Sequence, residues 1–126
     1  MRLNTYKDIK GDIMTTSDKQ WLFLQDVARL ILYAEGLGVK LTGGELYRTS
    51  YQQAEYLRTG KTTTRNSNHL RRMAIDFTLF INDEPQWTNC EEWEQLGYYW
   101  ESLDKANRWG GNYKPFLDLP HFERTD

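Results

Sequence analysis

Apolar residues recur at helical spacing in two long stretches of the chain. The first covers residues 18–35 and predicts an amphipathic helix, which a capping box at residues 17–20 opens and Gly36 and Gly38 close. Its expected buried stripe is Trp21, Leu24, Ala28, Ile31 and Leu32. The second stretch follows a cap formed by Thr88 and Glu91. Its expected buried stripe is Trp93, Leu96, Trp100 and Leu103.

Alternating apolar residues predict a strand between these helices, over residues 74–81. One face of this strand carries Ile75, Phe77, Leu79 and Ile81. Asp76 lies on the opposite face, because successive side chains of a strand alternate. Residues 39–48 alternate less regularly around two glycines and predict a further strand that ends at Arg48, on the rim of a cleft. A turn is expected at residues 82–85.

Polar segments connect these elements. A second capping box, at residues 50–53, opens a short helix that Gly60 closes. Residues 59–68 form a polar loop that we expect to cover the cleft. Residues 107–112 form another loop, whose Trp109 either lines the wall of the cleft or fills the core.

The order of these elements predicts one α+β domain over residues 1–126. We expect the two longer helices on one side of a small, mainly antiparallel sheet, with the functional site on its open face. A chain of 126 residues can bury a single core without disulfides. The core is expected over about residues 17–124, after an irregular lead over residues 1–16.

Composition narrows the class of function. The formal net charge is −2, and the lysines and arginines are scattered, so the basic footprint of a nucleic-acid-binding protein is missing. Cys90 is the only cysteine, so no internal disulfide forms, which suits synthesis in a reducing cytoplasm. No stretch has the pattern of a signal peptide or a membrane span. We therefore expect a soluble protein, cytoplasmic as made, with no stable membrane association.

A carboxylate inside a half-buried strand needs a partner, because burying an unpaired charge is costly. For Asp76 the nearby candidates are His69, Arg71 and Arg72. Two interpretations are open from this stretch alone. One is a structural ion pair between Asp76 and an arginine, and the other is a metal site shared by His69 and Asp76.

The second histidine, His121, also lies close to carboxylates. Asp118 precedes it by three residues, and Pro120 favours a bend that would bring both side chains together. Catalytic zinc usually takes three protein ligands and leaves a fourth position open. His69, Asp76 and His121 would supply that set, with Asp118 as a nearby base. The alternative is a surface acid beside a core histidine.

Three short motifs follow one another along the chain: Ser67-x-His69, Ala74-x-Asp76 and Asp118-x-x-His121. Upstream, Arg48 precedes a short segment that contains two glutamines. Over roughly residues 20–124 this pattern resembles the zinc peptidases of bacterial cell walls, which include D-alanyl-D-alanine carboxypeptidases and phage L-alanyl-D-glutamate endopeptidases. Arg72 departs from it, because many members have glycine three residues after the first histidine. A basic residue there is similar to the short, phage-type branch.

The resemblance implies a Hedgehog/DD-peptidase-like fold and one Zn2+ per chain, held by His69, Asp76 and His121. It implies that Asp118 acts as the base, that Arg48 stabilises the developing oxyanion and that Ser67 binds substrate. Trp109 is a further candidate for substrate contact.

The implied substrate is the stem peptide of peptidoglycan, and we favour the L-alanyl-D-glutamate bond over the D-alanyl-D-alanine bond. By family analogy, the protein would be a monomeric phage endolysin that acts in the periplasm or cell wall, to which a holin gives access. Two alternatives stay open: a non-catalytic wall-binding module with a structural metal, and an enzyme that uses iron or manganese on the same ligands.

Overall fold

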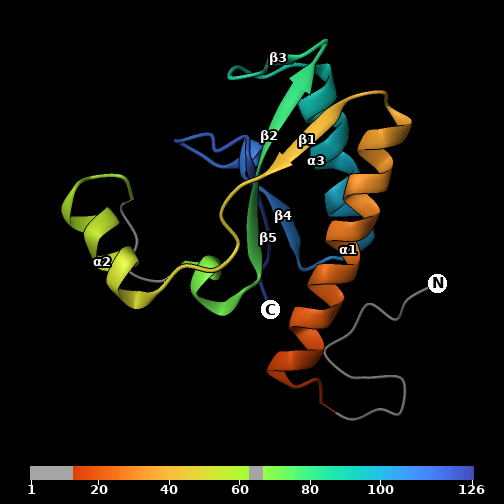
Figure 1. The fold of residues 1–126 in the computed structure, drawn as a ribbon. Coiled ribbons are helices and arrows are strands. Elements are labelled where there is room, and N and C mark those ends of the chain that lie inside the picture. Colours follow the sequence, from red (N-terminus) through yellow and green to blue (C-terminus); the bar gives the residue numbers. More distant parts are fainter. Residues whose placement is uncertain (1–12, 63–66) are drawn as a thin grey trace.

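Two long helices pack on one side of a small antiparallel sheet, and a short helix stands on the other side (Figure 1). The computed structural model describes residues 13–62 and 67–126. The helices are α1 (Thr16–Gly36), α2 (Ser50–Arg58) and α3 (Glu91–Leu103), with two 3-10 turns, η1 (Asn68–Arg71) and η2 (Gly110–Asn112). The strands are β1 (Lys40–Gly43), β2 (Ala74–Ile81), β3 (Glu84–Pro85), β4 (Asn107–Trp109) and β5 (His121–Arg124). The predicted α+β class is confirmed.

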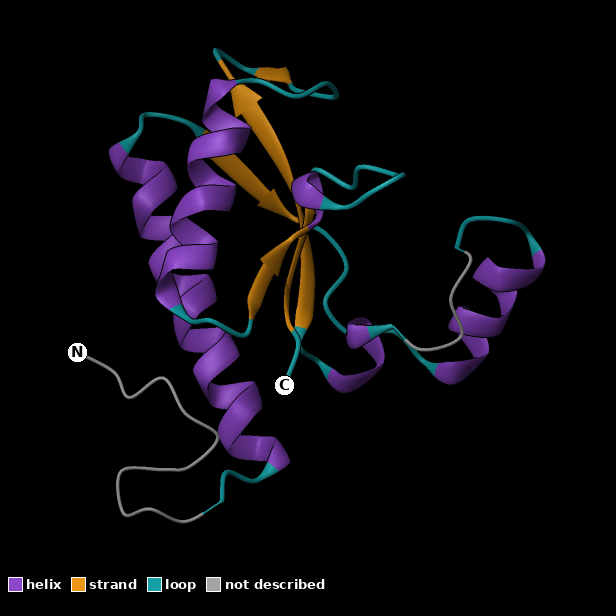
Figure 2. Cartoon of the chain, turned by 180° about the vertical axis from the view of Figure 1, so that it is seen from behind, coloured by secondary structure: helices purple, strands orange, loops and turns teal. Residues whose placement is uncertain are grey.

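The sheet runs in the order β1-β2-β5-β4, and β3 pairs with the far end of β2. Every pair of neighbouring strands is antiparallel. The last strand, β5, therefore lies between β2 and β4, as the view from behind also shows (Figure 2). In this register Asp76 lies opposite His121 and Ala74 lies opposite Glu123. Directly opposed residues project from the same face of a sheet, so the register brings Asp76 and His121 together.

The helix-facing side of β2 forms the core, as its alternation predicts. Buried core residues from β2 and α3 are Phe77, Leu79, Trp93, Leu96 and Trp100. A buried aromatic ring removes about 150–250 Å² of surface from water, so the tryptophans dominate this core. The indole N–H of Trp100 donates to the backbone oxygens of Arg108 (3.2 Å) and Glu123 (3.1 Å). The burial of this polar group therefore leaves no unsatisfied donor.

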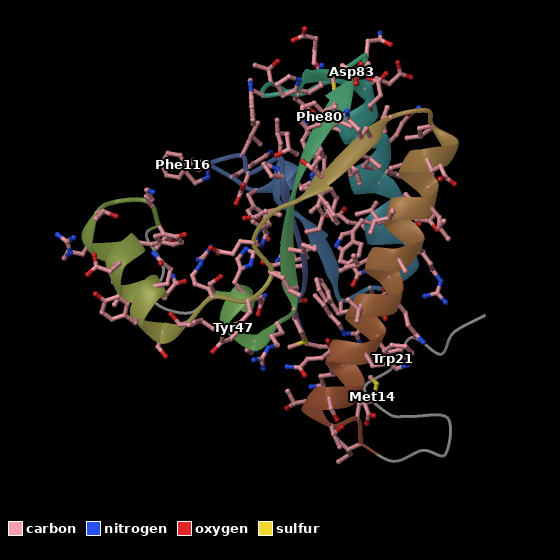
Figure 3. All side chains as sticks on the ribbon, viewed as in Figure 1. Met14, Trp21, Tyr47, Phe80, Asp83 and Phe116 are labelled. Carbon is pink, nitrogen blue, oxygen red and sulfur yellow. The ribbon has the colours of Figure 1, made fainter. Side chains whose placement is uncertain are left out.

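Helix α1 buries a different face from the predicted one. Its buried residues are Phe23, Asp26, Val27, Leu30 and Ala34. The five residues of the predicted stripe are exposed, with Trp21 at 59% on the outside of the helix (Figure 3). The sequence misleads because the true buried face carries Asp26, whose carboxylate accepts a hydrogen bond from Asn107 Nδ2 (3.0 Å). Even with this exposed apolar stripe, no helix among the described residues is long and apolar enough to cross a membrane.

The helix caps also differ from those predicted. Thr15 caps α1: its side chain accepts from the backbone N–H of Asp18, and the Asp18 carboxylate accepts from the Thr15 N–H. Thr49, one residue before the predicted cap, accepts from Gln52 N–H at the start of α2. Cys90 precedes α3 without a side-chain cap bond. Caps shift by one or two residues because several neighbouring hydroxyl and carboxylate groups can serve.

Strand β1 ends at Gly43, five residues before the predicted end at Arg48. Beyond it the chain still pairs with β2, but irregularly, because Gly44 N–H donates to the Asp76 oxygen (2.7 Å) and Asp76 N–H donates to Glu45 (2.9 Å). The predicted loop over residues 107–112 contains the short strand β4. Part of the predicted cleft-covering loop, residues 63–66, lies outside the described residues.

Trp109 of β4 packs against α3 at a glycine. A Cβ added to Gly97 would lie 2.1 Å from the Trp109 ring, so only glycine allows this close approach. The Trp109 indole N–H then donates to the Leu119 oxygen (2.8 Å) and holds the loop that leads into β5. Gly97 thus controls the position of a segment next to the site.

We therefore expect Gly97→Ala to lower the free energy of unfolding by about 1–3 kcal/mol, the usual cost of overpacking a core. Gly36→Ala is the matched control, because a Cβ at Gly36 meets nothing within 4 Å. That variant should leave stability unchanged or raise it by about 0.4–1 kcal/mol. Urea denaturation of both variants measures the difference, and equal stabilities would contradict the close-packing argument.

Candidate metal centre

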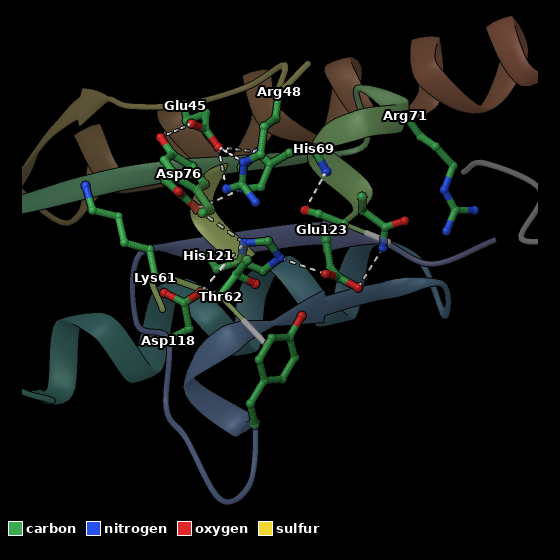
Figure 4. Close-up of a pocket in the computed structure, with 14 residues that line it drawn as sticks. Glu45, Arg48, Lys61, Thr62, His69, Arg71, Asp76, Asp118, His121 and Glu123 are labelled. Carbon is green, nitrogen blue, oxygen red and sulfur yellow. Dashed lines mark hydrogen bonds and ion pairs between the residues drawn. The ribbon is translucent and has the colours of Figure 1, made fainter. Parts of the chain in front are cut away.

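Three side chains converge where β2 meets β5, on the side of the sheet away from α1 (Figure 4). Asp76 Oδ1 lies 3.4 Å from His69 Nε2 and 3.2 Å from His121 Nδ1. One donor atom from each residue lies within 4.8 Å of the other two. Two imidazole nitrogens and a carboxylate oxygen at this spacing could hold a divalent metal ion. The structure thus brings together the three ligands predicted from the sequence.

Each residue reaches this point from a different segment. The register of β2 and β5 sets Asp76 opposite His121. His69 comes from η1, whose first turn is capped by Ser67: the Ser67 hydroxyl accepts from the His69 N–H (3.1 Å). The backbone oxygen of His69 in turn accepts from the Arg48 N–H (3.1 Å). These bonds fix η1 against the segment that follows β1.

Hydrogen bonds on the outer side of both rings decide which nitrogen faces Asp76. His69 Nδ1 lies 2.9 Å from the Leu46 carbonyl oxygen, which can only accept, so Nδ1 carries the proton. His69 Nε2 is then a buried acceptor with no hydrogen-bond partner among the described residues. His121 Nε2 lies 2.7 Å from Glu123 Oε1, which leaves Nδ1 toward Asp76. Metal-binding histidines are held in this way, so the donor set fits a metal ion.

The charge of Asp76 agrees with this fit. Burial alone would raise the pKa of Asp76, but the hydrogen bond from His121 and the nearby His69 ring outweigh it and hold the pKa well below its usual range. Burial would lower the pKa of His121, but hydrogen bonds to Asp76 and Glu123 raise it to about 9. Asp76 therefore stays negatively charged, the state in which a carboxylate binds a cation.

Asp118 lies beside this cluster, where the predicted bend before β5 places it. The His121 N–H donates to the Asp118 backbone oxygen (3.1 Å), and Asp118 Oδ2 lies 3.9 Å from His121 Nδ1. The approach depends on Gly110, since a Cβ there would lie 2.1 Å from the Asp118 oxygen. Although 53% of the side chain is exposed, partial burial raises the pKa of Asp118. Its carboxylate is thus a better proton acceptor than a fully solvated one.

Arg48 also reaches the cluster, and it contacts residues that the sequence did not predict as its partners. Its guanidinium is paired with Glu45, donates to Gln53 Oε1 (2.7 Å) and lies 4.7 Å from the centre of the Tyr56 ring. Tyr56 in turn donates to Glu45 Oε2 (3.1 Å). The only sequence signal for the pair is that Glu45 precedes Arg48 by three residues.

The cluster opens into a cleft of about 620 Å³. Its lining includes Arg48, Tyr56, Lys61, Tyr113 and Asp118. A cleft of this size fits a peptide or another small ligand. Because His69, Asp76 and His121 line this cleft, a metal ion bound by them would be accessible to a peptide in it.

A sequence profile of the D-alanyl-D-alanine carboxypeptidase family matches residues 60–124, about half of the chain. The chain belongs to this family. An L-alanyl-D-glutamate peptidase of Listeria phage A118 is 26% identical over 95 residues, which are 75% of this chain and 34% of that relative. The chain thus spans about a third of the length of this curated relative. The crystal structure of the L-Ala D-Glu endopeptidase ChiX of Serratia marcescens matches with a TM-score of 0.65 and 25% identity, over 96% of both chains.

Membership classes the chain with the metallopeptidases, which are hydrolases, and confirms the resemblance inferred from its motifs. The matched span includes both histidines, Asp76 and Asp118, whereas Arg48 lies outside it.

The presence of Arg72 where many family members have glycine has a physical explanation. Arg72 ends η1 with φ 57°, a left-handed conformation that glycine adopts most easily. Here its guanidinium lies 4.2 Å from the centre of the Tyr47 ring, a contact that offsets part of the strain.

Trp109 is corrected from a substrate-contact candidate to a core residue. Only 1% of it is exposed, because its ring fills the space left by Gly97 and Gly111. Trp109 affects the candidate metal centre only indirectly, through the hydrogen bond from its indole to the Leu119 oxygen. Ser67 lines the cleft, a position compatible with its predicted role in substrate binding, and it also caps η1.

We expect the purified, metal-free protein to bind one divalent ion per chain. His69→Ala, Asp76→Ala and His121→Ala should each weaken binding by at least about 100-fold, since each removes one of three donors. Asp83→Ala is the control, because it removes a carboxylate at the exposed β2–β3 turn. Isothermal titration with Zn2+ measures all four variants, and wild-type affinity in any of the three site variants would exclude that residue as a ligand.

Proposed function

We propose that the chain is a zinc-dependent peptidase that hydrolyses the L-alanyl-D-glutamate bond of peptidoglycan stem peptides. The observation that carries this proposal is the convergence of His69, Asp76 and His121 on an open cleft in a member of this peptidase family. Both relatives described above are named for the L-alanyl-D-glutamate bond. By analogy with the phage relative, we extend the proposal to a role as a phage endolysin that reaches the wall through a holin.

Zinc suits the donor set best. Catalytic zinc takes three ligands drawn from histidine and carboxylate and keeps one position open, as an open cleft allows. A structural zinc in a wall-binding module would need a fourth protein ligand, commonly cysteine, and Cys90 does not line this cleft. Iron or manganese could use the same ligands, so elemental analysis of protein purified without added metal tests the identity of the ion.

Each of these cleft residues then has a separate role in amide hydrolysis. When bound, the zinc ion supplies the Lewis acid. Asp118 takes the proton of the attacking water and returns it to the leaving amine, a cycle that its raised pKa favours. Glu45 and Gln53 hold the Arg48 guanidinium, whose remaining N–H groups stabilise negative charge on the substrate carbonyl oxygen. The Ser67 hydroxyl keeps its proton to donate to the substrate backbone.

Two cationic side chains of the cleft favour an acidic peptide. Lys61 and Arg71 both line it, and neither forms an ion pair with any other residue in the described part of the chain. Arg48, by contrast, is already paired with Glu45. A glutamate within a peptide keeps one carboxylate outside the main chain, and an uncompensated lysine or arginine can pair with it.

Digestion of purified peptidoglycan tests the bond assignment. We expect new amino groups on D-glutamate and stem fragments that begin with this residue, detected by mass analysis. A D-alanyl-D-alanine carboxypeptidase is the second candidate, because the matching family carries that description. Release of free D-alanine as the only product would favour that candidate, and no product at all would contradict both.

The Asp118→Asn variant tests the role of Asp118 in the chemical step independently of metal binding. The amide has the size of the carboxylate but cannot take up a proton at neutral pH, so turnover should fall about 100- to 10,000-fold. Zinc content and melting temperature should stay at wild-type values, because Asp118 is half exposed and is not one of the three donors. Asp83→Asn, at the exposed β2–β3 turn, is the matched control for kinetics. Near-normal turnover of Asp118→Asn would remove Asp118 from the mechanism.

A further inference from the structure

Glu123 lies on the side of the His121 ring away from Asp76 (Figure 4). Its Oε1 lies 2.7 Å from His121 Nε2, and its Oε2 accepts from Asn68 Nδ2 (2.9 Å). The side chain is only 15% exposed. A buried carboxylate with both oxygens engaged has few other arrangements open to it, so its position is well defined.

The two partners of Glu123 belong to the two histidine-bearing segments. Asn68 lies in η1 directly before His69, and His121 begins β5. Glu123 therefore connects segments that are 55 residues apart in the sequence. Tyr113 also lies beside these residues, with the centre of its ring 5.8 Å from that of the His121 ring. Burial, and next the charge of Glu123, raise the pKa of Tyr113, so its hydroxyl stays neutral beside the carboxylate.

An imidazole ring alone does not select which of its edges faces a ligand. Its χ2 torsion has two broad minima, and a half-turn exchanges Nδ1 with a carbon atom. A bond to Nε2 removes this ambiguity, because the half-turn would also carry Nε2 away from Glu123. In the observed orientation Nδ1 lies 3.2 Å from Asp76 Oδ1.

We propose that Glu123 is a positioning residue for the metal centre: it orients the His121 ring so that Nδ1 faces Asp76 and, through Asn68, holds η1 beside β5. The inference rests on the proposed function, since it assumes that these histidines bind the metal. A negatively charged partner also makes the imidazole a stronger donor, which adds to the effect of orientation.

The test compares Glu123→Ala with Glu123→Gln. The alanine variant loses the bond to His121, and we expect its Kd for Zn2+, measured by competition with a chromogenic chelator, to rise about 10- to 100-fold. The glutamine variant can still accept from His121 Nε2. Its NH2 group can donate to Asn68 Oδ1, which has no hydrogen-bond partner among the described residues of the wild type, if the Asn68 amide turns over. Glutamine should therefore recover most of the lost affinity.

Glu84→Ala is the matched control, because it removes an exposed glutamate at β3, beyond the other end of β2. A spectroscopic signal adds a second readout: the His121 Nε2–H proton of the zinc-loaded protein should give a slowly exchanging NMR resonance in the wild type and in Glu123→Gln, but not in Glu123→Ala. Where Glu123→Ala does not fold, Asn68→Ala replaces it, with an expected smaller rise in Kd.

An unchanged Kd in Glu123→Ala, or in Asn68→Ala when it serves as the replacement, would overturn the proposal. Equal losses in the alanine and glutamine variants would also overturn it, because charge and not orientation would then be responsible. These results leave the proposed function intact. A wild-type protein that fails to bind zinc would instead refute the metal centre itself, and the role of Glu123 with it.

Discussion

The antiparallel pairing of β2 with β5 is the constraint on which the site depends. It sets Asp76 opposite His121 across 45 residues of sequence, and it sets Ala74 opposite Glu123. One side of this pair packs into the core through Phe77 and Phe122, so the register cannot slip without moving apolar residues to the cleft face. The geometry of the candidate metal centre is thus stabilised by the same burial that stabilises the domain.

The two aspartates of the cleft show how neighbours decide the state of a carboxylate. Burial acts in the same direction on Asp76 and Asp118 and raises the pKa of each. For Asp76, the hydrogen bond from His121 and the nearby His69 ring reverse the effect, and the pKa falls. The Asp118 carboxylate lies 3.9 Å from the His121 ring without a hydrogen bond to it, and burial prevails. The site therefore separates a permanently charged carboxylate from one that can exchange a proton, a division of roles common in enzymes.

Rigid support surrounds the cluster on several sides. The Leu46 carbonyl holds His69, Glu123 holds His121 and Glu45 holds Arg48. The last two are charge-assisted contacts, which are shorter and stronger than neutral ones. A strained residue is also tolerated beside the site: Arg72 adopts a left-handed conformation at a cost of about 1–2 kcal/mol. The cation–π contact between Arg72 and Tyr47 offsets about 0.5–1 kcal/mol of this conformational cost.

The sequence by itself determined the features that depend on neighbouring residues: the strand over residues 74–81, the buried stripe of α3, the bend before His121 and the order of the ligand motifs. These follow from periodicity, turn chemistry and residue type, which act over a few positions. Only the tertiary structure decided which face of α1 is buried, because the buried Asp26 accepts a hydrogen bond from Asn107, far along the chain, in addition to its ion pair with Arg29. It also decided that Trp109 fills the core and that Glu45 and Glu123 join the site. Such choices depend on strand pairing and packing between distant segments, and no local pattern in the sequence encodes those contacts.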